Sequence, residues 1–270
     1  EGSNSTSRLA LTEAIVDHQT FFLTSQQAKF ASPDVSKYKD RYLSLFPPGV
    51  SLLGAPFFLL GKLLSVPQII AYLSVALTAL INVILITLLS RRLGASLPAS
   101  LLSSTTFLFA TNALSYSSTY TQHHATSMVL LLTLLLVNSR LSALNSLYIG
   151  LISGLGVLLD LPNLLFVFPA LLFYSHRYLS RFPIALRFTA AIPGLALPIS
   201  FLLWYNISTT NSPFLMAQFV GRAREFVTSP SPTNTPSSAR KFSLPYDSRK
   251  LVNGLYILLI SNERGWFYYF

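Results

Sequence analysis

The sequence predicts an all-α membrane protein: a multi-spanning helix bundle with a polar first outer loop and a broken helix pair near Asp160. Two observations predict this fold class. Of the 270 residues, 51% are hydrophobic and only 10% are charged, whereas soluble globular chains carry about 25% charged residues. Long uncharged stretches also recur along the chain, as membrane-spanning helices require. These features exclude an ordinary soluble enzyme and a disordered chain. The lack of Cys excludes a disulfide-stapled secreted domain.

The chain divides by composition into four regions. Residues 1–65 are expected to form an outer loop with interfacial helices, and residues 66–205 the transmembrane bundle. Residues 206–250 are expected to form another outer loop, flexible where Ser, Thr and Pro are frequent. Residues 251–270 predict a re-entrant or interfacial segment that leads to later spans. We expect the chain to be the N-terminal fragment of a longer protein, without its first span.

Five apolar segments make up the predicted bundle. The first, residues 66–90, has no charged residue. As a helix it would extend roughly 37 Å, enough to cross a hydrocarbon core of about 30 Å. The helix of the short third segment is expected to begin in the preceding loop, and prolines are expected to bend the fifth. The other four segments are residues 97–118, 125–139, 146–174 and 188–205.

The fourth segment is interrupted at Asp160. Pro162 removes a backbone donor there, and a carboxylate that faces lipid costs a few kcal/mol. Each half has about 13 or 14 residues, fewer than the roughly 20 that a span needs. We therefore expect two half-helices that meet near one membrane face. Asp160 is a candidate functional group or a cap of the second half-helix, and these two interpretations are compatible.

Arginines orient the predicted bundle. The loops at 91–96, 140–145 and 175–187 contain six basic and no acidic residues, so the positive-inside rule assigns them to the cytoplasm. The non-cytoplasmic side then carries residues 1–65 and 206–250 and all nine acidic residues. Because the net charge of +10 is divided between a topology signal and a mixed-charge surface, we expect no nucleic-acid partner.

Two adjacent histidines, His123 and His124, precede the third segment on the non-cytoplasmic side. Adjacent residues point in different directions on a helix, so their spacing does not predict a metal pair. Contact with an anion or a sugar is the functional interpretation, and simple solvation is the alternative. No metal-ligand motif is visible. The sequence does not identify a cofactor, and a divalent metal is one of the candidates.

Three groups of residues carry a family resemblance. Residues 8–16 form an Arg-containing helix, and residues 38–53 a Tyr-rich segment that passes through Pro47-Pro48-Gly49 into an apolar helix. Residues 150–163 contain the broken helix, and residues 261–269 an Arg-Gly pair followed by aromatic residues. In this combination the chain resembles GT-C class membrane glycosyltransferases of the protein O-mannosyltransferase and lipid A aminoarabinose transferase type.

The resemblance implies transfer of a sugar from a polyprenyl-phosphate donor to an acceptor at the non-cytoplasmic face, with inversion. It implies an acidic general base in the first outer loop and cationic groups that hold the phosphate. Two positions differ from the family: Ser5-Thr6-Ser7 stands where relatives often carry Asp, and Phe46 where they often carry Lys. The expected substitutes are, for the base, Glu1, Asp34 and Asp40, and, for the phosphate, Arg8, Arg41 and Arg264.

The expected partners are a lipid-linked sugar donor and membrane lipid, and the acceptor is left open. Two other functions stay open as well. A transporter or flippase without covalent chemistry could use the break at Asp160, because discontinuous helices also build transport sites. A catalytically degenerate membrane protein would explain the two departures from the family pattern.

Overall fold

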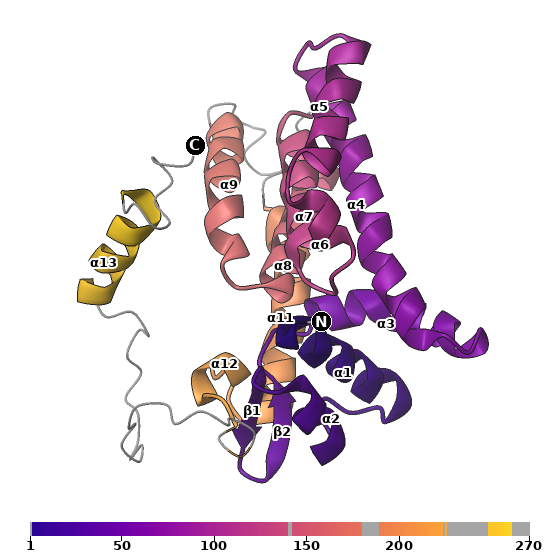
Figure 1. Ribbon diagram of the computed structural model, residues 1–270. Coiled ribbons are helices and arrows are strands. Elements are labelled where there is room, and N and C mark those ends of the chain that lie inside the picture. The colour runs from indigo at the N-terminus through magenta and orange to yellow at the C-terminus, as the bar shows by residue number, and fades with distance from the viewer. Residues whose placement is uncertain (1, 140–141, 180–188, 224, 226–247, 261–270) are drawn as a thin grey trace. The chain divides into compact units, whose positions relative to one another are not determined.

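The computed structural model describes residues 2–139, 142–179, 189–223, 225 and 248–260, and it is predominantly helical (Figure 1). Glu1 and Arg264 lie outside the described residues. The chain forms two compact units, residues 1–227 and residues 228–270. The described part of the second unit is the helix α13, Ser248–Leu259. The candidate site lies in the first unit.

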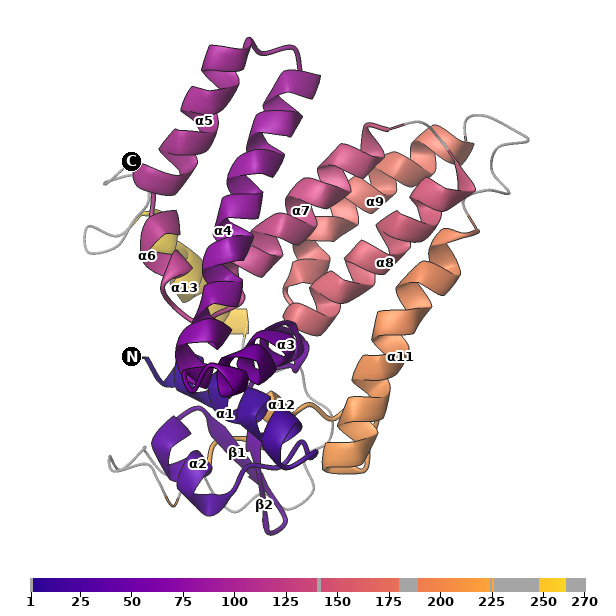
Figure 2. The ribbon, with the colours of Figure 1, turned by 90° about the vertical axis from the view of Figure 1, so that its right-hand side faces the viewer.

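Of residues 1–65, which we expect to form an outer loop with interfacial helices, the described part folds into an ordered N-terminal module. Its helices are α1 (Ser3–Asp17), α2 (Ser25–Ala31) and α3 (Gly49–Leu63). Both ribbon views place α1 and α2 at one end of the long helices (Figures 1 and 2). A buried apolar cluster of small and aliphatic side chains from α1, α2 and the adjoining strand holds the module together.

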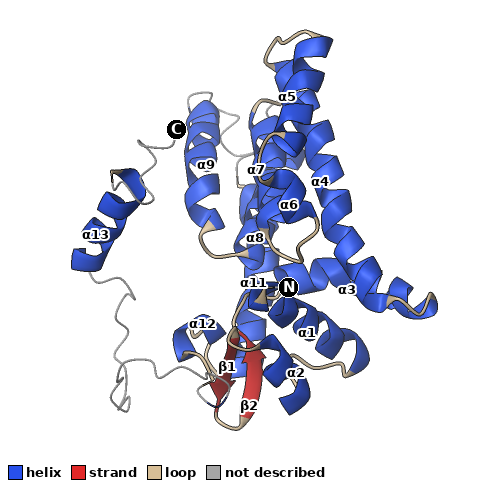
Figure 3. Ribbon diagram, viewed as in Figure 1, coloured by secondary structure: helices blue, strands red, loops and turns tan. Residues whose placement is uncertain are grey.

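The module also contains a β-hairpin, which the all-α prediction lacks (Figure 3). Strands β1 (Val35–Tyr38) and β2 (Arg41–Ser44) are antiparallel, with Val35 opposite Ser44 and Tyr38 opposite Arg41. A two-residue turn joins them. The hairpin forms because Val35 and Leu43 are fully buried in the module, which no local pattern in a short polar segment reveals.

The helix bundle follows the predicted order of apolar segments. The first segment is α4, and residues 97–118 are divided between α5 and α6, because the side chain of Thr111 bonds to the carbonyl oxygen of Phe107 and accepts from the amide of Ala113. The helices are α4 (Pro67–Arg92), α5 (Leu97–Phe109), α6 (Ala113–Ser117), α7 (His123–Val137), α8 (Ala143–Leu159), α9 (Asn163–Leu179) and α11 (Ala191–Thr210).

The break at Asp160 is present, but the flanking helices are longer than expected. Both α8 and α9 have 17 residues, about 25 Å at the helical rise. Ser142 caps α8 by accepting a hydrogen bond from the amide of Asn145, which starts the helix three residues early. The pair is therefore a helical hairpin with Asp160 in its turn, rather than two short half-helices.

Among the described residues, two helices, α4 and α11, are long and apolar enough to cross a membrane. The faces of α4 differ in an informative way. Its buried face carries small and polar residues such as Ser74, Thr78 and Asn82, while Leu77, Leu80 and other large apolar residues are exposed. A water-soluble helix has the opposite arrangement, and small polar residues between helices are typical of membrane bundles.

Helices α8 and α11 pack side by side with their backbones very close (Figure 2). A methyl group added at Gly150 of α8 would lie 2.0 Å from the carbonyl oxygen of Ala191, and one added at Gly194 of α11 would lie 2.2 Å from that of Leu147. Glycine is therefore required at both positions of this contact. This close contact fixes the position of α11, and of the segment after it, relative to α8.

Gly150→Ala should destabilise the bundle, because the methyl group meets backbone atoms that move only if a whole helix shifts. We expect a loss of about 1–3 kcal/mol, seen as a lower midpoint of thermal unfolding by intrinsic fluorescence in detergent. Gly254→Ala in α13 is the matched control, because its methyl group would have no atom within 4 Å. Equal midpoints for wild type and Gly150→Ala would contradict this packing.

Candidate functional site

A buried arginine marks the site. Helix α1 carries Arg8. Its side chain is completely buried, although arginine is long and charged. Its Nε donates to Oδ1 of Asn4 at 2.8 Å, one helical turn earlier, and its Nη2 donates to Oε1 of Gln122 at 2.8 Å. The ring of Phe46 lies 4.3 Å from the guanidinium carbon. Nη1 is buried and has no hydrogen-bond partner among the described residues.

Gln122 connects the arginine to Asp160. Its Nε2 donates to Oδ2 of Asp160 at 3.1 Å, while its Oε1 accepts from Arg8. The amide thereby bridges a cation and a carboxylate that are 152 positions apart in the sequence. The carboxylate is only half-buried, so solvent or a ligand can reach it, whereas Arg8 is fully buried.

Two glycines of α3 bring these segments together. A methyl group at Gly49 would lie 2.5 Å from the carbonyl oxygen of Leu158, so the Pro47-Pro48-Gly49 turn fits directly against the end of α8. A methyl group at Gly54 would lie 1.7 Å from the hydroxyl of Tyr120. That hydroxyl shares a 2.9 Å hydrogen bond with Thr12, which anchors the loop before Gln122 to α1.

Burial governs the electrostatics of the site. Desolvation lowers the pKa of Arg8 to about 10, although the nearby Asp160 acts in the opposite direction. The guanidinium therefore stays charged at neutral pH. Desolvation also raises the pKa of Asp160 above the usual aspartate range, and the charge of Arg8 offsets part of this shift. An unpaired buried N–H costs about 1–3 kcal/mol, so the free Nη1 of Arg8 is a position at which an anion would be stabilising.

Asp34, a predicted base, has a different environment. Its Oδ2 accepts from the hydroxyl of Ser3 at 2.7 Å, and its Oδ1 accepts from Nη2 of Arg222 at 3.3 Å. Its backbone oxygen accepts from the hydroxyl of Ser7. Both carboxylate oxygens are thus engaged in joining the hairpin to α1 and to the segment after α11. Asp34 is close enough to act on the pKa of Arg8.

The two histidines separate as their spacing predicts. His124 is buried, and its Nε2 lies 2.8 Å from the carbonyl oxygen of Ala113. Because that oxygen only accepts, Nε2 carries the proton and Nδ1 faces the amide of Asn82. Both nitrogens of His124 therefore serve packing between α4, α6 and α7. His123 is exposed, with its ring centroid 4.2 Å from that of Tyr116, and it acts electrostatically on Asp160.

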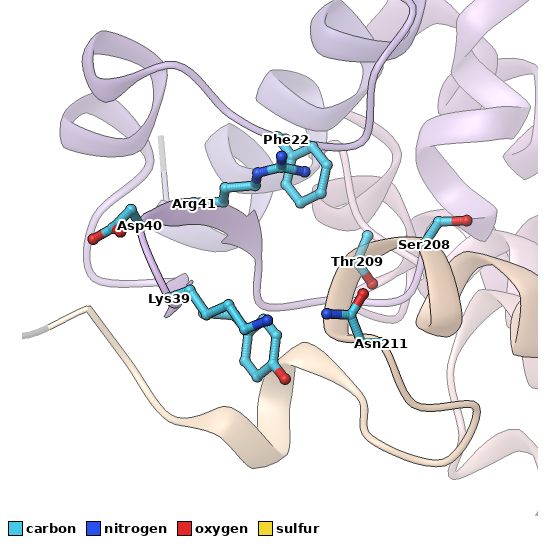
Figure 4. Close-up of a pocket in the computed structure, with 8 residues that line it drawn as sticks. Phe22, Lys39, Asp40, Arg41, Ser208, Thr209 and Asn211 are labelled. Atoms are coloured by element: carbon cyan, nitrogen blue, oxygen red, sulfur yellow. The ribbon is translucent and has the colours of Figure 1, made fainter.

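Asp40 and Arg41 lie away from Arg8, at the tip of the hairpin. They line a pocket of about 310 Å³ between the hairpin turn and the C-terminal end of α11 (Figure 4). Of the predicted site residues in the described part of the chain, Arg8, Asp160 and His123 therefore come together, with Asp34 nearby, whereas Asp40 and Arg41 belong to another place. Glu1 and Arg264 lie outside the described residues.

Gln122 is the functional residue that the sequence analysis missed. Its only local signal is its place next to His123, at the N-terminal cap of α7. No spacing connects positions 8, 122 and 160. Phe46 was noted only as a departure from the family pattern, and the structure puts its ring on the guanidinium of Arg8.

Among the described residues, no group of three or more His, Cys, Asp or Glu side chains is placed to hold a metal ion. Comparisons of the chain with models of protein families, with curated proteins and with solved structures found no significant match.

Arg8 and Asp160 should be energetically coupled. We expect Arg8→Met to destabilise the protein, and the double variant to be about 1 kcal/mol more stable than the summed effects of Arg8→Met and Asp160→Asn predict. The coupling is modest because Asp160 is half-exposed and an amide stands between the charges. Chemical unfolding in detergent measures it.

The control cycle pairs Arg8→Met with Asp17→Asn. Asp17 ends the same helix and pairs with Lys62, roughly 13 Å along α1 from Arg8. Additive losses are expected there. Additive losses in the Arg8 and Asp160 cycle would contradict the bridge through Gln122.

The raised pKa of Asp160 predicts a specific pH dependence of stability. The folded state holds this proton more tightly than the unfolded state, whose aspartate pKa is about 3.9. The stabilising contribution is therefore fully present below that pH and is lost as the pH rises through the folded-state pKa. From pH 4 to pH 7, the unfolding midpoint of wild type should therefore fall relative to that of Asp160→Asn. If the midpoint of wild type instead rises relative to that of Asp160→Asn, the attraction of the carboxylate to Arg8 outweighs the cost of its burial.

Proposed function

We propose that this chain is a multi-pass membrane glycosyltransferase that takes a sugar from a polyprenyl-phosphate donor at the non-cytoplasmic end of its bundle. The observation that carries the proposal is the buried Arg8 guanidinium, whose Nη1 has no partner among the described residues and which is linked through Gln122 to a half-buried carboxylate. The expected reaction needs this pair of groups: a cation for the phosphate and a carboxylate for the acceptor proton.

The exposure pattern supports the membrane part of the proposal. Large apolar side chains point outward along α9 as well as α4; Leu165 of α9 is 76% exposed. Exposed apolar surface of this extent would bring soluble copies together, whereas lipid covers it without penalty. The C-terminal end of α4, which carries Arg91 and Arg92, lies at the opposite end of the bundle from the N-terminal module (Figure 1). Under the positive-inside rule the module, and with it Arg8, then faces away from the cytoplasm.

The phosphate role falls to Arg8. Guanidinium groups hold phosphate through two parallel hydrogen bonds, and a water-poor site strengthens them. The ring of Phe46 covers the guanidinium of Arg8, with 4.3 Å between its centroid and the guanidinium carbon. Donor binding then requires the half-buried Phe46 ring to move aside, and the phosphate takes over the contact with Nη1.

Asp160 is the best placed general base among the described carboxylates. Asp34 has both oxygens engaged, and Asp40 lies at the hairpin tip. In the proposed step, Asp160 accepts the proton of the acceptor hydroxyl while that oxygen bonds to the anomeric carbon. The bond between the anomeric carbon and the phosphate oxygen breaks, and the polyprenyl phosphate leaves with its charge facing Arg8. A raised pKa suits a base that must hold the proton it takes.

The experiment measures binding and transfer of radiolabelled polyprenyl-phosphate mannose and glucose by the full chain in nanodiscs. We expect saturable binding that Arg8→Gln weakens by roughly tenfold or more, because a charge-assisted pair is lost. Asp160→Asn should keep binding but lower transfer or donor hydrolysis by about 100-fold or more.

Arg92→Gln is the matched control, because Arg92 lies at the other end of the bundle and contacts the carbonyl oxygen of Leu135. It should leave binding unchanged. No binding of either donor by a folded preparation would sink the proposal. Binding without any transfer or hydrolysis would instead identify a degenerate, donor-binding protein.

A further inference from the structure

A second polar pocket lies between the hairpin and α11, and none of its lining residues belongs to the Arg8 site. Its volume is about 310 Å³. One wall comes from the hairpin turn and from Phe22, and the other from the end of α11. The lining residues are Phe22, Tyr38, Lys39, Asp40, Arg41, Ser208, Thr209 and Asn211.

The hairpin wall presents two cations on aromatic supports. The guanidinium carbon of Arg41 lies 4.5 Å from the ring centroid of Phe22, and Nζ of Lys39 lies 5.6 Å from that of Tyr38. Stacking orients a guanidinium while its edge N–H groups stay free to donate. Neither cation has an ion pair within the described part of the chain. Figure 4 shows the carboxylate of Asp40 pointing away from the pocket. The wall therefore attracts an anion.

The opposite wall offers neutral hydrogen-bonding groups. Ser208 and Asn211 are exposed at the end of α11, and Figure 4 shows Asn211 beside Thr209. The hydroxyl of Thr209 is engaged with the carbonyl oxygen of Tyr205 at 2.8 Å, so Ser208 and Asn211 are the groups available to a ligand. A hydroxyl and an amide match the hydroxyl groups of a sugar. The partly buried rings of Phe22 and Tyr38 opposite leave some aromatic surface for the apolar face of a sugar ring.

The turn itself is built at a conformational cost. Lys39 has a φ of +55°, in the left-handed region that glycine adopts most easily. Asn211, on the other wall, has a φ of +58°. Strained residues of this kind gather at binding sites when the side chain is needed there. A lysine at the first turn position, where hairpins favour glycine, places its ammonium group at the pocket.

We propose that this pocket is a binding site for an anionic saccharide, separate from the site at Arg8. Arg41 and Lys39 contact the acidic group, while Asn211 and Ser208 donate to or accept from the ring hydroxyls. The proposal does not depend on sugar transfer at Asp160. The anionic saccharide can be a free sugar acid or sugar phosphate, or the headgroup of a glycolipid, because all present the same chemistry.

The test titrates the full chain, in nanodiscs of zwitterionic lipid, with glucose 6-phosphate and with glucuronate by calorimetry. Glucose and inorganic phosphate are the matched ligands that lack the charge or the ring. A parallel arm measures binding of a diacylglycerol glucuronoside incorporated in the nanodisc, which distinguishes a headgroup from a free ligand. We expect at least one anionic saccharide to bind saturably, and more tightly than glucose and phosphate, with an affinity that falls as salt is added.

Variants separate this pocket from the Arg8 site. Arg41→Gln should weaken binding roughly tenfold, and Arg8→Gln should leave it unchanged. Lys39→Gly is the sharpest variant: it relieves the backbone strain, so the unfolding midpoint should rise or stay equal while the affinity falls. The proposal is overturned if no anionic saccharide binds, if phosphate alone binds as well, or if Arg41→Gln and Lys39→Gly leave the affinity unchanged.

Discussion

The burial of one guanidinium group organises the site end of this protein. Removing a charge from water costs several kcal/mol unless its donors find partners, and Arg8 recruits partners from four segments. Asn4 comes from its own helix, Gln122 from the start of α7, Phe46 from the turn before α3, and Asp160, through Gln122, from the end of α8. These contacts fix the four segments relative to one another, because the buried charge would otherwise lack hydrogen-bond partners. Nη1 has no partner among the described residues, and that is where the site can gain from a ligand.

The long helices supply a frame whose exposure pattern is reversed from that of a soluble bundle. Many of their small and polar side chains lie inside, and many of their large apolar side chains lie outside, as α4 shows. Close contacts at Gly150 and Gly194 take the place of large interdigitating side chains between α8 and α11. The frame therefore holds the N-terminal module at one end, where both candidate ligand positions lie: the Arg8 cluster beside α8 and the cationic pocket beside α11.

The Pro47-Pro48-Gly49 motif has both a local role and a role in tertiary contact. Pro47-Pro48-Gly49 suggests a turn into a helix by its composition alone. Its glycine is needed for another reason, since a side chain at Gly49 would strike the backbone of Leu158. The turn thus places Phe46 over Arg8 and α3 beside the Asp160 turn. Residues that the family resemblance singled out in separate pieces of sequence meet here, although no comparison found a matching protein.

The sequence alone determined the helices, because runs of apolar residues and the caps and prolines that end them are local signals. It located α4, α7, α11 and the break at Asp160. It selected Asp160 as a candidate because charge is rare in apolar surroundings, and Arg8 through the family resemblance. Only the tertiary structure decided that Gln122 joins them, that His124 packs inward, that Asp34 is engaged, and that Arg41 faces a separate pocket. Those outcomes depend on which segments desolvate one another, and desolvation is a property of contacts between distant residues rather than of any stretch of sequence.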